Sequence, residues 1–138
     1  MEAQIEIELT ARAIDQHREL PAELAGAAGA RAEFAGNVRG EEDGRAIAAL
    51  EYEAYSPMAE SEMRRILMDI LRRHACLFVR VTHRTGIVPV GAAAVHIVVL
   101  ARHRTAALSL VAEFMDRLKQ DVPIWKRRAL TAAELKAN

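Results

Sequence analysis

A nearly unbroken apolar run covers residues 92–100 and is interrupted only by His96. A short run of this kind, rich in valine, is typical of a strand buried inside a sheet. A histidine in such a run is more often a hydrogen-bonded core residue than a ligand. The chain is therefore expected to build a sheet with this strand at its centre. No apolar run is long enough to span a bilayer.

Four other segments have strand-like patterns: residues 5–9, 30–38, 46–55 and 76–83. The first alternates apolar residues with glutamates, which is typical of a half-buried strand. The polar segment 39–44, bounded by glycines, predicts a loop.

The clearest helix is predicted from Ser56, as N-cap, and Pro57, as the first helical residue. On its outer face Glu60 and Arg64 are expected to pair. Its apolar residues recur with helical spacing at Met63, Ile66, Leu67, Ile70 and Leu71. A second amphipathic helix is predicted over residues 105–119, with a stripe of Leu108, Val111, Met115 and Leu118.

An alanine-rich stretch, residues 11–28, predicts one further short helix that starts at Pro21 and ends near Gly26 or Gly29. The resulting order, βαββαββα, predicts an α+β fold with helices on one side of a sheet. At 138 residues the chain is expected to form one domain, 1–138, with residues 129–138 as a short tail.

Charge is balanced overall but unevenly distributed. The net charge is zero, so no global field favours nucleic acid or a membrane as partner. Residues 1–69 hold 7 basic and 15 acidic residues, whereas residues 70–138 hold 12 basic and 4 acidic ones, so the second half could present an anion site. The single Cys76 and the lack of a signal-peptide pattern predict a cytoplasmic protein.

Lysine is rare: 16 of the 19 basic residues are arginine, and the lysines are Lys119, Lys126 and Lys136. Unlike arginine, a lysine amine can lose its proton when it is desolvated or lies beside other cations. The segment 117–128 contains two of the three lysines, with Pro123 to end the helix and Trp125 as an expected apolar anchor. The alternative is a helix end whose cations complement its dipole, followed by a solvated basic tail.

Other cations also fall at the ends of predicted elements: Arg39 after a strand, and His103 and Arg104 before a helix. Together with the two lysines they predict one pocket for an anionic ligand, with some members supplied across a dimer interface. The five histidines are scattered, so a metal site is not expected.

Several segments together resemble the large, catalytic subunit of molybdopterin synthase, the MoaE family. The resemblance covers roughly residues 5–128 and rests on residues 34–39 (FAGNVR), 50–58 (LEYEAYSPM), 83–86 (HRTG), 88–91 (VPVG), 103–104 (HR), 118–119 (LK) and 123–126 (PIWK). It implies an α/β-hammerhead fold with a mostly antiparallel sheet, and a homodimer at the centre of a heterotetramer. The implied partner is a ubiquitin-like sulfur carrier whose C-terminal Gly-Gly thiocarboxylate enters the pocket.

The implied reaction converts cyclic pyranopterin monophosphate to molybdopterin by inserting two dithiolene sulfurs, with no cofactor. By the same resemblance, Lys119 and Lys126 are the catalytic residues. The implied substrate-binding residues are Asn37, Val38, Arg39, His103, Arg104, Arg127 and Arg128. The chain departs from the family where Arg128 replaces a usual acidic residue and in its short tail. Two alternatives stay open: a non-catalytic paralogue, and a regulatory α+β domain that binds a small anionic metabolite.

Overall fold

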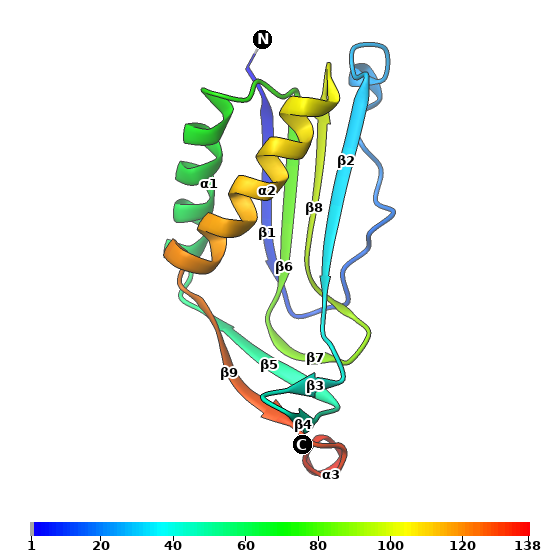
Figure 1. The fold of residues 1–138 in the computed structure, drawn as a ribbon, viewed down its shortest axis with the longest axis vertical. Helices are drawn as coiled ribbons and strands as arrows, with labels where there is room; N and C mark the ends of the chain where they lie inside the picture. Colours follow the sequence, from blue (N-terminus) through cyan, green and yellow to red (C-terminus); the bar gives the residue numbers. More distant parts are fainter. Residues whose placement is uncertain (1) are drawn as a thin grey trace.

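The computed structural model describes residues 2–138 and contains a large sheet, covered on one face by two helices, and a smaller sheet at one end (Figure 1). The main sheet has the order β1-β6-β8-β2 and the small sheet the order β7-β5-β9. The strands are β1 (Gln4–Thr10), β2 (Ala30–Asn37), β3 (Glu41–Glu42), β4 (Arg45–Ala46), β5 (Ala49–Ala54), β6 (Phe78–Arg84), β7 (Gly86–Pro89), β8 (Ala93–Ala101) and β9 (Ile124–Leu130). The helices are η1 (Ala22–Leu24), α1 (Met58–Leu71), α2 (Arg104–Asp121) and α3 (Ala132–Ala137).

The apolar run predicted as a central strand is β8, and every residue of β8 is buried. It pairs antiparallel with both β6 and β2, while β1 pairs parallel with β6. His96 on β8 is hydrogen-bonded, as expected, because its Nε2 lies 3.0 Å from a carboxylate oxygen of Glu33 on β2. The mixed α+β fold with mostly antiparallel strands is confirmed.

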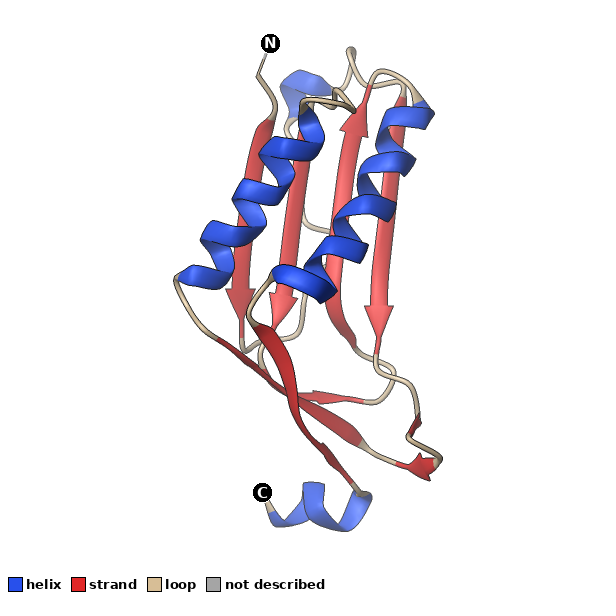
Figure 2. Cartoon of the chain, turned by 60° about the vertical axis from the view of Figure 1, so that its left-hand side comes forward, coloured by secondary structure: helices blue, strands red, loops and turns tan. Residues whose placement is uncertain are grey.

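Helices α1 and α2 pack side by side on one face of the main sheet (Figure 2). The predicted apolar stripe of α1 is confirmed, since Met63, Ile66, Leu67 and Ile70 are fully buried. Its predicted start is wrong: Pro57 occupies the N-cap position, and the Ser56 hydroxyl donates to the Glu60 carboxylate instead (2.7 Å). Because that bond engages Glu60, the predicted pair of Glu60 with Arg64 is not formed. The ion pair near this turn joins Arg65 to Glu62.

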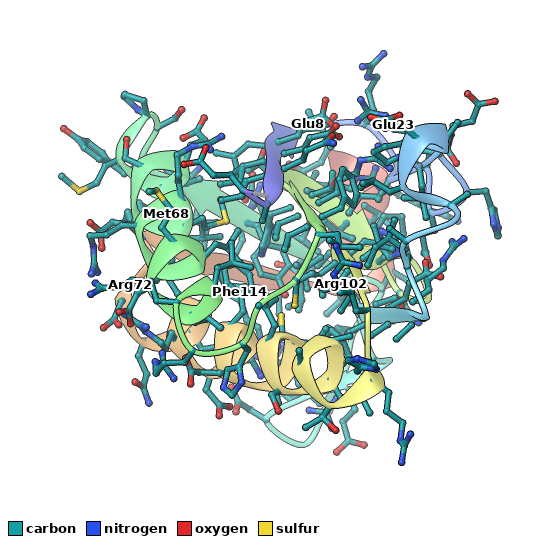
Figure 3. The ribbon with its side chains drawn as sticks, turned by 90° about the horizontal axis from the view of Figure 1, so that it is seen from above. Glu8, Glu23, Met68, Arg72, Arg102 and Phe114 are labelled. Atoms are coloured by element: carbon teal, nitrogen blue, oxygen red, sulfur yellow. The ribbon has the colours of Figure 1, made fainter. Side chains whose placement is uncertain are left out.

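The stripe predicted for α2 is shifted, because Leu108 is 59 % exposed. The residues that face the sheet are Ala107, Leu110, Phe114 and Leu118. Both sets satisfy the helical spacing, and packing favours the set containing Phe114, the largest apolar side chain available. Figure 3, which looks down on the layers, shows Phe114 on the inner side of α2 and Arg72 on the outer side of α1.

On the opposite face of the sheet, the helix predicted within residues 11–28 is reduced to the single turn η1. Few residues separate Pro21 from Gly26, and so short a helix does not offset its nucleation cost. The segment instead covers the sheet as an irregular layer, with Leu24 packed against Phe78, Leu100 and their neighbours.

The C-terminal segment, predicted as a basic loop and a short tail, instead contributes a strand to the small sheet. Residues 124–130 form β9, which pairs antiparallel with β5, and Trp125 is 45 % exposed rather than an anchor. Residues 39–46, predicted in part as a loop, contain the β3–β4 hairpin. In α3 the Thr131 side chain and Glu134 form a capping box. None of the helices in residues 2–138 has the length and apolar character needed to cross a membrane.

Candidate active site

A cavity of about 560 Å³ is lined by residues from the C-terminal end of α2 and from the small sheet. Its polar lining residues are Asn37, Arg39, Tyr52, His83, Lys119 and Lys126. Its apolar lining includes Phe34, Met115 and Trp125. The lining therefore combines apolar side chains with several cations. This combination suits a ligand with a flat ring and an anionic group.

Four of the predicted site residues reach this cavity from three elements. Lys119 stands in the last turn of α2, which ends at Asp121 just before Pro123, as predicted. Lys126 lies on β9, directly opposite Tyr52 of β5. Asn37 and Arg39 follow the β-bulge at the end of β2, where the chain leaves the main sheet. The meeting of α2 with the small sheet thus brings together residues that the sequence left apart.

Lys126 is held in place by a carboxylate outside the cavity lining. Its ammonium donates to Glu42 of the β3–β4 hairpin at 3.1 Å, although half of the lysine side chain is exposed. An ion pair this exposed contributes little to stability. It does fix the direction in which the lysine points.

The remaining predicted site residues lie elsewhere in this single chain. Val38 is buried with Leu50 and Val88, and its backbone bonds to Ala92 and Gly91. His103 and Arg104 are at the N-terminal end of α2, which is about 27 Å from its other end at 1.5 Å per residue. The helix therefore separates these two cations from Lys119.

Arg127 and Arg128 are engaged with carboxylates on β5. The guanidinium of Arg128 donates to Glu51 at 2.6 Å and to the side chain of Asn138 at 3.0 Å. Its hydrogen bond lowers the pKa of the Glu51 carboxyl. Arg127, at a bulge of β9, lies 3.9 Å from Glu51 and from Glu53 and lines a different groove. Neither arginine lines the cavity that holds the lysines.

Two residues that line the cavity, Tyr52 and His83, were not among the predicted site residues. Both lie inside segments that carry the family resemblance, but spacing alone does not show that β5 and β6 turn them toward the lysines. Their rings are 5.2 Å apart in an edge-to-face arrangement. Burial lowers the pKa of His83, an effect that its hydrogen bond to the Arg84 carbonyl partly offsets, and burial raises the pKa of Tyr52. In residues 2–138 no group of His, Cys, Asp and Glu is arranged to hold a metal ion.

The fold and the cavity define a class: an α+β protein with a cation-lined pocket at the junction of two sheets. A family model described as MoaE protein matches residues 6–121. The chain therefore belongs to the MoaE family, and the resemblance seen in its motifs is confirmed.

Several relatives extend this comparison. The chain is 44 % identical over 99 residues to the human molybdopterin synthase catalytic subunit, covering 72 % of this chain and 53 % of the relative. It is 35 % identical over 132 residues to the protein of the same name from Dictyostelium discoideum, covering 94 % and 84 %. It spans about half the length of the mammalian relatives it matches.

Solved structures agree with the fold. The structure of molybdopterin synthase from Staphylococcus aureus has a TM-score of 0.76 and 31 % identity, and covers 86 % of this chain and 87 % of that one. A complex of subunits 1 and 2 of molybdopterin-converting factor from Helicobacter pylori has a TM-score of 0.70 at 23 % identity, covering 93 % and 90 %. The latter supports the fold alone.

Proposed function

We propose that this chain is the catalytic subunit of a sulfurtransferase that converts cyclic pyranopterin monophosphate to molybdopterin. A small ubiquitin-like carrier brings each of the two dithiolene sulfurs as the thiocarboxylate of its C-terminal Gly-Gly. Curated relatives of the chain are molybdopterin synthase catalytic subunits, which supports this activity.

The observation that carries the proposal is the meeting of Lys119 and Lys126 with Arg39 in one cavity. Two of the chain's three lysines come from different elements to the same place. Cations there can stabilise both the substrate phosphate and the oxyanion that forms at the thiocarboxylate carbon. A lysine amine can in addition move a proton or form a transient acyl link.

In this proposal Lys119 and Lys126 are catalytic, and Asn37 and Arg39 bind the pterin and its phosphate. Val38 lies between these two residues and holds them in place through its backbone bonds to Ala92 and Gly91. The two arginines of β9, Arg127 and Arg128, line the outer part of the substrate site. For them to reach the substrate, their pairs with Glu51 and Glu53 have to open. Arg127 lies 3.9 Å from each of its carboxylates, so freeing it costs little free energy. Freeing Arg128 breaks a 2.6 Å hydrogen bond to Glu51, whose side chain is 16 % exposed, and therefore costs more.

The assembly in this proposal is a homodimer at the centre of a heterotetramer, with one carrier bound to each catalytic subunit. The two cations at the start of α2, His103 and Arg104, are exposed and lie a helix length from Lys119. A second copy therefore supplies them to the pocket. The Helicobacter pylori structure shows this fold in a complex of two subunits.

The proposed compartment is the cytoplasm. The one thiol of the chain, Cys76, is buried, and burial raises its pKa to about 11. A thiol of this kind reacts slowly and forms no disulfide within the chain.

The test is conversion of cyclic pyranopterin monophosphate by the purified chain with a thiocarboxylated carrier. The dithiolene product is measured together with the desulfurated carrier. We expect both to appear in a ratio of one product to two carriers. A chain that binds the pterin but leaves the carrier thiocarboxylate intact would instead be a non-catalytic paralogue.

A further inference from the structure

The lysine cavity holds cations but no carboxylate. Arg39, Lys119 and Lys126 line it, and no Asp or Glu among residues 2–138 does. Its other titratable side chains are Tyr52 and His83. A reaction that releases a proton in this cavity needs an acceptor, and an imidazole is the neutral base available there at neutral pH.

The hydrogen bonding of His83 leaves one ring nitrogen able to accept a proton. The imidazole is 5 % exposed, and its Nδ1 lies 2.8 Å from the Arg84 carbonyl oxygen. A carbonyl oxygen can only accept, so Nδ1 carries the proton and Nε2 keeps its lone pair. Within residues 2–138 no side chain or backbone group bonds to Nε2. The edge-to-face contact with Tyr52 holds the plane of the ring.

We propose that His83 accepts a proton from the water that releases the carrier from the substrate after each sulfur transfer. The inference rests on the proposed function. Once the thiocarboxylate sulfur has bonded to a substrate carbon, a thioester joins carrier and substrate. Water attacks the carbonyl carbon, the carbon–sulfur bond of the acyl group breaks, and the electron pair stays on the sulfur. One proton of the water goes to Nε2 of His83, and the other ionises from the new carboxyl group.

Burial of His83 favours a base that gives its proton up again. Besides the adjacent Arg84, the titratable and charged groups of the cavity are Tyr52 on β5, Arg39 after β2, Lys119 on α2 and Lys126 on β9 with its partner Glu42. Burial lowers the pKa of His83 and so disfavours a lasting imidazolium. Burial also raises the pKa of Tyr52, so its hydroxyl stays protonated beside the ring.

The test uses His83→Asn, whose amide can still donate to the Arg84 carbonyl but has no acceptor at the Nε2 position. In single turnovers with the thiocarboxylated carrier and cyclic pterin, hydrolysis should slow about 10²-fold or more, the usual contribution of a positioned base. The carrier–substrate thioester should then accumulate and be detected by mass spectrometry. His17→Asn, at an exposed histidine, is the matched control and should behave as the unaltered chain.

A second measurement needs no variant. For the unaltered chain, the hydrolysis rate should fall with acid below about pH 6.5, where an imidazole titrates, and not above neutrality, where a lysine does. A rate that depends on pH only above neutrality would overturn the inference, as would full activity of His83→Asn without a trapped thioester. If the unaltered chain transfers no sulfur, the proposed function fails and the inference with it.

Discussion

At the residue scale, the two cavity lysines differ in how they are held. Lys126 is tethered to Glu42, whereas Lys119 is exposed at the end of α2 and has no ion-pair partner within residues 2–138. An amine that is not tied to a carboxylate can approach a bound carbonyl carbon. This difference favours Lys119 as the residue that acts on the acyl group and Lys126 as the one that positions the substrate.

If Lys119 acts as an amine, Lys119→Arg should keep the charge and still lose most sulfur transfer, because a guanidinium does not become a neutral nucleophile. The expected loss in single turnovers is about 10²-fold or more. Lys136→Arg, on α3 outside the cavity, is the control and should transfer sulfur normally. Near-normal transfer by Lys119→Arg would move the catalytic assignment to Lys126.

The buried imidazole should also affect stability. Because burial depresses the pKa of His83 in the folded state, the unfolded chain binds more protons once the pH falls below about 6.5. The stability that neutral His83 contributes is therefore fully present above that pH. It is lost as the pH falls through the pKa that His83 has in the folded chain. Urea unfolding between about pH 5 and 8 should show a smaller pH dependence for His83→Asn than for the unaltered chain. Identical curves would contradict this.

At the scale of single elements, α2 has two roles. One of its faces packs on the core, and its last turn carries Lys119. Its rotation about its own axis decides both. With Leu110 and Phe114 inward, the C-terminal turn places Lys119 at the cavity. With Leu108 inward instead, the helix would be rotated by about 100° per residue of shift, and the lysine would turn with it.

Leu108 and Leu110 of α2 test this rotation. Leu110→Ala removes a fully buried side chain and should lower the free energy of unfolding by about 2–5 kcal/mol. Leu108→Ala, at a position that is 59 % exposed, should change it by no more than about 0.5 kcal/mol. Urea denaturation measures both. Equal losses would mean that the helix packs with a different face.

At the scale of the whole molecule, the main sheet has two unpaired edges, β1 and β2, and the start of α2 carries exposed cations far from the cavity. A dimer in which each copy completes the other's pocket accounts for those cations. We expect light scattering to give about twice the 15.3 kDa mass of the chain at micromolar concentration.

Shared pockets predict complementation. A preparation of Lys119→Ala and one of Arg104→Ala should each be weakly active, because each lacks one residue in every pocket. When the two are unfolded together and refolded, about a quarter of all pockets should be intact, since half of the dimers are mixed and each has one intact pocket. Refolding each variant alone is the control. Failure to recover activity in the mixture would place Arg104 outside the partner's pocket.

Local pattern was sufficient to predict the elements that can pack in only one way. The run that became β8 has no polar face, and the stripe of α1 is apolar on one side only, so local pattern and tertiary packing agree. The motifs around Arg39, His103, Lys119 and Lys126 also indicated the family before any geometry was known. The short segment from Pro21 to Gly26 was misjudged because alanine favours helix locally, whereas covering the sheet did not require one.

Which residues meet in the cavity depends on long-range packing. Two faces of α2 satisfy the same spacing, and the choice depended on how Phe114 fills the core. The basic segment after α2 became β9 because β5 offered an edge with which it could pair, a long-range interaction that local sequence does not encode. That pairing placed Lys126 at the cavity opposite Tyr52 and left Arg128 on Glu51. The cavity depends on contacts between residues far apart in the chain, and those contacts exist only once the two sheets are assembled.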